Sequence, residues 1–216
     1  MSDRLCPEPV APLLILIAAT HGEEDTVCMA TQPISEQPLG GRLISVEEYL
    51  STGYEPDCEF EDGVLVERNV GEFEHSFLQT ILAVLFTNNM DSWGVFALTE
   101  QRVQLTPRHF LVPDVCVLRL GAPTEDILAH PPLIVIEIMS PEDTLRRASR
   151  KAQEYVQFGI ENVWVIDPSA RVAFRGGPKG LERVSGNELV VAGTPILVDV
   201  PELFEKLDRI RATGQR

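Results

Sequence analysis

A single carboxylate inside a run of apolar residues is the feature that most constrains the fold of this chain. Residues 133–139 read Leu-Ile-Val-Ile-Glu-Ile-Met, so Glu137 is flanked by isoleucine on both sides. A short run rich in branched aliphatic residues predicts a central β-strand with both faces buried. Burying a carboxylate there costs free energy unless a cation or a hydrogen-bond donor meets it. The sequence therefore predicts that the fold supplies such a partner to Glu137.

A second carboxylate, Asp114, opens another apolar run, residues 115–118, directly after Pro113. Hard divalent ions such as Mg²⁺ prefer carboxylate oxygens and keep water molecules in the rest of their shell. If the strands that carry Asp114 and Glu137 are neighbours, both carboxylates can reach one ion. That ion would polarise a phosphate and lower the pKa of an attacking water molecule. The pair thus indicates a metal-dependent hydrolytic site.

A basic segment follows the strand, and it ends with Lys151, fourteen positions after Glu137. The segment lies on a predicted helix, and a helix that packs back on the strand could bring Lys151 over the carboxylates. The alternative is that Arg146, Arg147, Arg150 and Lys151 form a solvated basic face, as runs of charge usually do.

Composition narrows the class of protein. The chain has 216 residues, 44% of them hydrophobic, which fits one domain with a sizeable core. Its formal net charge of −15 argues against tight non-specific binding of nucleic acid, but a nuclease remains compatible because metal ions and local basic residues can offset the charge. The four cysteines are scattered without zinc-ligand spacing, which favours a reducing, cytoplasmic setting.

The N-terminal part reads differently from the rest. Residues 11–19 are apolar but much shorter than the about 20 residues that a membrane span needs. We therefore expect no membrane association, and we interpret residues 1–28 as an upstream extension. Residues 1–41 as a whole are predicted to be a poorly ordered extension and linker, followed by a single domain at 42–216.

Hydrophobic periodicity and turn signals give the expected elements. The predicted helices are Val46–Ser51, Glu74–Asn88, Thr144–Phe158 and Leu203–Ala212. The predicted strands are a hairpin over 58–68 that turns at Asp62-Gly63, then Gly94–Thr99, Gln101–Leu105, Val115–Leu118, Leu133–Met139, Asn162–Ile166, and a C-terminal meander of Arg171–Phe174, Leu181–Val184, Glu188–Val191 and Thr194–Val198. Residues 123–132 read as a loop or broken helix. The pattern predicts an α/β or α+β domain with a mixed central sheet and flanking helices.

These residues, in this order, resemble the Uma family of putative restriction endonucleases, bacterial proteins of the PD-(D/E)xK nuclease superfamily. The strings that carry the resemblance are Pro113-Asp114, Ile136 to Pro141, Lys151 with Tyr155, residues 159–168, residues 59–65 and His75, and together they span about residues 42 to 200. The resemblance implies a restriction endonuclease-like core with one or two Mg²⁺ or Mn²⁺ ions and DNA as substrate. It also makes a homodimer plausible, because many nucleases of this superfamily pair up to cut both strands.

The resemblance also implies roles for individual residues. Asp114 and Glu137 would be metal ligands, joined by the backbone carbonyl of Ile138. Glu59 matches an acidic position that can add a ligand, and Lys151 matches a helix-borne lysine that replaces the usual one. The usual position, two residues after the glutamate, holds Met139, so activity depends on whether Lys151 reaches the site.

Other readings of these residues stay open. His75 matches a family position, but a histidine at a helix start also often bonds a carboxylate or the backbone. Glu59 could be an exposed hairpin residue, and Tyr155 and Trp164 read as aromatic residues of the core. Asp167-Pro168 is most simply a turn.

Three functions are compatible with the sequence. The first is a metal-dependent endonuclease that hydrolyses DNA phosphodiester bonds through an activated water. The second is a catalytically inert nuclease-fold module that binds a partner or a nucleic-acid end, which the acidic balance and Met139 favour. The third is a plain structural domain in which a buried arginine or lysine neutralises Glu137. A structure with Glu137 pointing away from Asp114 would support it.

Overall fold

The strand that carries Glu137 lies in the middle of a six-stranded mixed sheet in the computed structural model, which describes residues 43–69 and 71–214. The strand order is β10-β9-β8-β7-β6-β3. Its members are β3 (Val95–Thr99), β6 (Val115–Arg119), β7 (Ile134–Ile138), β8 (Asn162–Asp167), β9 (Val172–Gly177) and β10 (Gly180–Arg183). Strands β7 and β8 are parallel and the other neighbours are antiparallel. The predicted mixed sheet is confirmed.

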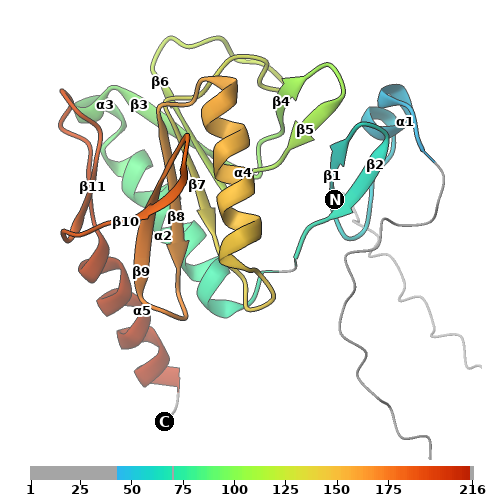
Figure 1. Ribbon diagram of the computed structural model, residues 1–216. Helices are drawn as coiled ribbons and strands as arrows, with labels where there is room; N and C mark the ends of the chain where they lie inside the picture. The colour runs from blue at the N-terminus through green and yellow to red at the C-terminus, as the bar shows by residue number, and fades with distance from the viewer. Residues whose placement is uncertain (1–42, 70, 215–216) are drawn as a thin grey trace, which may run out of the picture. The chain divides into compact units, whose positions relative to one another are not determined.

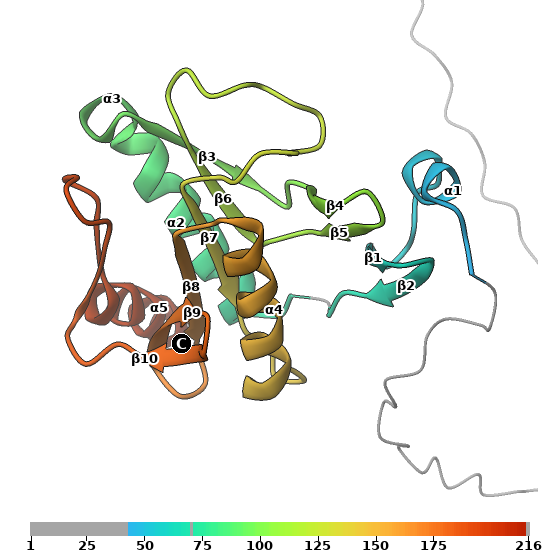
Figure 2. The ribbon, with the colours of Figure 1, turned by 45° about the horizontal axis from the view of Figure 1, so that its top comes forward.

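Helix α4 (Leu145–Phe158) connects the two parallel strands and packs on one face of this sheet, against β8, β9 and β10. The hydroxyl of Thr144 caps its first turn by accepting from the N–H of Arg147, at 3.2 Å. Gly159 ends it in the left-handed conformation, with φ of 105°. Figures 1 and 2 show α4 on one face of the sheet and α2 on the other.

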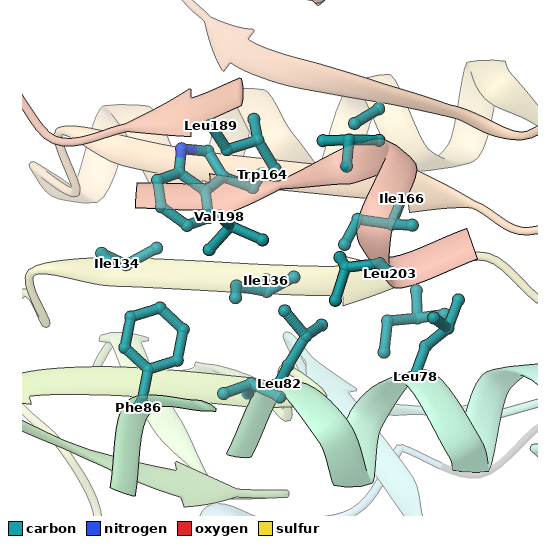
Figure 3. Packing of buried hydrophobic residues seen from close by; sticks show 14 of the residues in the cluster. Leu78, Leu82, Phe86, Ile134, Ile136, Trp164, Ile166, Leu189, Val198 and Leu203 are labelled. Carbon is teal, nitrogen blue, oxygen red and sulfur yellow. The ribbon is translucent and has the colours of Figure 1, made fainter. Parts of the chain in front are cut away.

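Helices α2 (Phe73–Asn88) and α5 (Val200–Gly214) pack on each other on the opposite face. Their apolar side chains meet those of β7 and β8 in the largest hydrophobic cluster, which Figure 3 shows. Labelled members include Leu78, Leu82, Phe86, Ile134, Ile136, Trp164, Ile166 and Leu203. Because side chains alternate along a strand, Ile134 and Ile136 face this cluster, whereas Val135 joins the cluster under α4. Glu137 falls on the α4 face by the same alternation.

A second, four-stranded sheet has the order β2-β1-β5-β4. It contains β1 (Cys58–Glu61), β2 (Val64–Glu67), β4 (Val103–Thr106) and β5 (His109–Leu111). The predicted hairpin turn is confirmed, since Asp62 and Gly63 both have positive φ, 50° and 99°. Helix α1 (Val46–Ser51) carries Tyr49 onto this sheet, against Phe60 and Phe110, and the predicted cap by Ser45 is present.

The predicted meander was wrong in one respect, because its strands divide between two sheets. Strands β9 and β10 extend the central sheet, whereas β11 (Glu188–Val190) and β12 (Leu197–Asp199) pair separately. Strand β5 and the short helix α3 (Met90–Trp93) were not predicted. Helix α5 begins three residues earlier than predicted, because Asp199 accepts a hydrogen bond from the N–H of Glu202 and the proline in the first turn is compatible with a helix.

All described residues belong to one compact unit. The predictions about residues 1–41 fall outside the described part of the chain and stay predictions. No helix in the described ranges is both long and apolar enough to cross a membrane.

Candidate active site

The two predicted metal-ligand carboxylates come together at one end of β6 and β7. These strands are antiparallel, and Val115 lies opposite Ile136. Asp114, just before β6, is therefore next to the end of β7 where Glu137 lies. The N–H of Ile138 donates to Oδ2 of Asp114 at 2.7 Å, so a main-chain donor of β7 holds the Asp114 side chain at this end of the strand.

Asp114 is buried and fully supplied with donors. Its Oδ1 lies 3.0 Å from a guanidinium nitrogen of Arg68, and its Oδ2 lies 3.2 Å from Nε2 of His75. Burial by itself would raise the pKa of Asp114, but the hydrogen bond and charge of His75, the charge of Lys151 and the N–H of Ile138 together lower it. Asp114 therefore stays ionised well below neutral pH.

Glu137 receives two donors on the same oxygen. The hydroxyl of Tyr155 donates to Oε1 at 2.6 Å, and Nζ of Lys151 lies 2.9 Å from that atom. Burial raises the pKa of Glu137 to about 7, opposed by Lys151 and supported by the charges of Asp114 and Glu59.

Lys151 joins this carboxylate to a third one. Its Nζ lies 2.7 Å from Oε1 of Glu59 and 2.9 Å from Oε1 of Glu137. Burial opposes the charge on Lys151, but the surrounding carboxylates, Glu137 first, raise its pKa. The ammonium is therefore held in its protonated form. For Lys151 the alternative of a solvated face is wrong, because only 19% of its side chain is exposed.

Glu59 is not the exposed hairpin residue of the alternative reading, since it is only 5% exposed. It lies in the middle of the strand β1, and its Oε1 also accepts a hydrogen bond from the N–H of Val112 at 3.0 Å. The second sheet thus delivers a carboxylate to the face of the first one, beneath α4.

His75 lies in the first turn of α2 and is buried. Its contact with Asp114 matches the alternative in which a histidine at a helix start bonds a carboxylate. Burial lowers its pKa, but the hydrogen bond to Asp114 and the charge of Asp114 outweigh this and raise it. Its Nδ1 is buried and has no hydrogen-bond partner among the described residues.

The five predicted site side chains line one hollow of about 60 Å³, a size that admits an ion or a few water molecules. They are Glu59, His75, Asp114, Glu137 and Lys151. Its remaining lining includes Arg68, Asn69, Met139, Asp143 and Arg147. A second hollow of about 90 Å³ shares Glu59, Arg147 and Lys151 with the first, so the two adjoin along α4.

The donor chemistry of the hollow suits a hard divalent ion, although no group of three or more His, Cys, Asp or Glu side chains within 43–69 and 71–214 is already arranged as a metal site. Basic groups hold oxygens of the three carboxylates predicted as metal ligands: Arg68 and His75 meet Asp114, and Lys151 meets Glu59 and Glu137. Oε2 of Glu137 and Oε2 of Glu59 accept no hydrogen bond from a described residue. These two oxygens are the ones available to an ion without displacing a donor.

Two residues of the site were missed in the sequence. Tyr155 is buried, as expected of a core aromatic residue, but its hydroxyl bonds Glu137. Its spacing of four from Lys151 on a helix, which puts both on one face, was the available signal. Arg68 contacts Asp114 from the end of β2, and no local pattern marks it. Trp164 is a core residue and Asp167 caps a turn by accepting from the N–H of Ala170, as predicted.

Comparisons with known proteins bear on this arrangement. The family model described as "Uma2: Putative restriction endonuclease" matches residues 46–192, well over half of the chain. The chain belongs to the Uma2 family. Comparison with curated proteins gave no match.

One solved structure supports this fold for the Uma2 protein. It is similar to a crystal structure titled as a putative nuclease belonging to DUF820 from Anabaena variabilis, with a TM-score of 0.65, 22% identity, and coverage of 76% of this chain and 99% of that chain. It also matches the structure of a DrdV–DNA complex with a TM-score of 0.34 and 16% identity, over 49% of this chain and 9% of that chain. The predicted restriction endonuclease-like fold is confirmed.

Proposed function

We propose that this Uma2 protein is a metal-dependent endonuclease that hydrolyses DNA phosphodiester bonds. The observation that carries the proposal is the meeting of Lys151 with Glu137, at 2.9 Å, beside Asp114 in one hollow. Membership of a family described as restriction endonucleases supports the same class of reaction. The single ammonium of Lys151 meets two carboxylates, Glu59 and Glu137, so this cluster holds more carboxylate than a simple ion pair of Lys151 requires.

In this mechanism Asp114, Glu137, Glu59 and the backbone carbonyl of Ile138 would hold Mg²⁺ or Mn²⁺. The bound ion would polarise the scissile phosphate and lower the pKa of the attacking water. The lowered pKa of Asp114 keeps this ligand ionised at neutral pH.

Lys151 acts in this mechanism as a cation and not as a base. Its raised pKa keeps the ammonium protonated at neutral pH. A fixed positive charge stabilises the negative charge that develops on the phosphate during hydrolysis. The ammonium of Lys151 would thus supply the positive charge that Met139, at the usual lysine position, cannot supply.

The second candidate is a nuclease-fold module without activity. Its support is that both oxygens of Asp114 already meet donors, Arg68 on Oδ1 and His75 with the N–H of Ile138 on Oδ2, so an ion could bind Asp114 only in competition with them. The net charge of −15 also disfavours strong binding of DNA. In this reading DNA or another partner binds, but no bond is cut.

Conversion of supercoiled plasmid to nicked and linear forms separates the two candidates. Wild type, Glu137→Ala and a matched surface control, Glu182→Ala, are compared with Mg²⁺, Mn²⁺ and EDTA. Cleavage by wild type and by the control, with none in Glu137→Ala or in EDTA, is the expected result. Folded wild type that shifts DNA in a gel but cuts nothing with either metal would favour the inert module. Sedimentation of the same samples tests the homodimer that the family resemblance implies.

A further inference from the structure

Tyr155 makes the shortest hydrogen bond to any carboxylate of the site. Its hydroxyl lies 2.6 Å from Oε1 of Glu137, and its side chain is completely buried. Both residues are fixed by the fold: Tyr155 lies within α4, and Glu137 lies within β7.

The hydroxyl shares its acceptor atom with Lys151. Tyr155 and Lys151 are four positions apart on α4, so they project from the same helical face. Both meet Oε1 of Glu137, while Oε2 accepts no hydrogen bond from a described residue. Two donors on one oxygen fix the rotation of the carboxylate and leave the other oxygen free.

Lys151 alone would not fix Glu137 in this way, because its ammonium is also bound to Glu59 at 2.7 Å. The tyrosine hydroxyl, in contrast, has Glu137 as its one hydrogen-bond partner among the described residues, so it would keep Oε1 in place if a bound ion changed the contacts of Lys151. Groups that orient a metal ligand in this manner typically change metal affinity by 10- to 100-fold when removed.

We infer that Tyr155 is a positioning residue, whose hydroxyl holds Oε1 of Glu137 so that Oε2 is presented to a divalent ion. The inference rests on the proposed function, since it assigns Tyr155 a role toward the metal of that site. This role differs from core packing. For packing alone the ring would suffice, and the buried hydroxyl would only add the free-energy cost of needing an acceptor.

Binding of Mn²⁺ alone, measured by titration calorimetry without DNA, tests this role. The central variant is Tyr155→Phe, which keeps the ring and removes the donor. Tyr49→Phe is the matched control, because Tyr49 is equally buried and donates to the backbone carbonyl of Cys58 at 2.9 Å, and neither Tyr49 nor Cys58 lines the hollow. We expect Tyr155→Phe to weaken Mn²⁺ binding by about tenfold or more and Tyr49→Phe to change it by less than about twofold.

If Tyr155→Phe does not fold, Tyr155→Met is measured instead. It also lacks the hydroxyl, and the flexible methionine side chain adapts to irregular gaps in a core. Urea unfolding of each variant establishes that the protein measured is folded. Wild-type Mn²⁺ affinity in either folded Tyr155 variant would overturn the inference.

Failure of the proposed function gives a different pattern. If Glu137→Ala loses Mn²⁺ binding while Tyr155→Phe keeps it, only the role of Tyr155 is overturned. If wild type binds no Mn²⁺, or if Glu137→Ala binds it as tightly as wild type does, the metal site is overturned together with the role of Tyr155.

Discussion

The ammonium of Lys151 lies 2.9 Å from Oε1 of Glu137, although fourteen positions separate the two residues. The chain leaves β7 after Ile138 and returns along α4, and Lys151 in the second turn of this helix reaches back to Glu137 near the end of the strand. A lysine at position 139 would have been the sequence-adjacent solution. Met139 instead packs in the cluster beneath α4, and the helix supplies the charge.

Removing the ammonium should affect activity and stability together. Lys151→Met leaves the buried Glu59 and the largely buried Glu137 without their shared cation, so we expect a loss of about 3 kcal/mol in the free energy of unfolding at pH 8. We also expect DNA cleavage to fall by at least about 100-fold. Urea unfolding and plasmid cleavage measure the two effects. The control Lys206→Met breaks only the exposed helical pair with Glu202 and should cost less than about 0.5 kcal/mol. Equal stability of the two variants would contradict the buried pairing.

Arg68 should stabilise the fold through Asp114. Arg68→Gln removes the charged donor 3.0 Å from Oδ1 of Asp114 and leaves His75 and the N–H of Ile138 on the other oxygen. Because the aspartate is buried and keeps part of its donors, we expect a loss of roughly 1–3 kcal/mol in urea unfolding. Arg108→Gln is the matched control, since the pair with Asp62 is exposed, and should change stability by less than about 0.5 kcal/mol. Similar values for both variants would argue against a structural role of Arg68.

The stability of the metal-free protein should fall as pH rises between about 4.5 and 6.5. The folded pKa of Glu137, about 7, is above its unfolded value, so in this interval the folded state binds a proton that the unfolded state has released. For one titrating group, the free energy of unfolding changes by at most about 1.4 kcal/mol per pH unit. The raised pKa of His75 also makes stability fall as pH rises, but only above the unfolded pKa of about 6.5. The lowered pKa of Asp114 makes stability fall as pH falls, and only below about pH 4.

Urea unfolding from pH 4.5 to 6.5 compares wild type with Glu137→Gln, which cannot titrate. The variant should lack the downward slope of wild type across this interval. Parallel curves for the two proteins would show that Glu137 ionises normally in the folded state.

The exposed arginines of α4 should contact the DNA backbone. Arg150 is 65% exposed at the rim of the hollow that adjoins the site, and Arg146 is exposed one turn before it. Each phosphate contact that is lost should reduce the slope of log affinity against log salt concentration by about 0.9 for duplex DNA. We therefore expect Arg146→Gln with Arg150→Gln to weaken binding and flatten the salt dependence, as measured by fluorescence anisotropy in Ca²⁺.

The control for this prediction is Arg209→Gln. Arg209 is an exposed arginine on α5 and lines neither hollow. It should leave the salt dependence as in wild type. An unchanged slope in the α4 variant would place the DNA elsewhere on the protein.

Much of this fold follows from local sequence patterns. The buried strand at 133–139, the helix that begins after Thr144 and ends at Gly159, and the Asp62-Gly63 hairpin depend on periodicity, caps and turn residues that lie within a few positions of each other. Strand β5 was missed because three residues are too few to carry a period. The separation of β11 and β12 from the central sheet was missed because strand pairing depends on contacts distant in sequence.

The residues of the site likewise differ in whether the local sequence reveals them. Asp114 and Glu137 stand out because a carboxylate beside or inside an apolar strand is anomalous, and Lys151 becomes relevant once a helix is placed after the strand. Arg68 is a basic residue at the end of a hairpin strand, a common surface position, and only the pairing of β1 with β5 brings that hairpin to the site. Tyr155 reads as a core residue by composition, and the hydrogen bond that gives it another role depends on the distance between α4 and β7.

The most direct test of the central claim is single-turnover cleavage of an end-labelled DNA duplex by wild type and by Glu137→Ala, each with Mn²⁺ and with EDTA. We predict cleavage only by wild type with Mn²⁺, with both proteins equally folded by urea unfolding. Cleavage by Glu137→Ala at the rate of wild type, or by wild type in EDTA, would contradict a metal-dependent site built on Glu137.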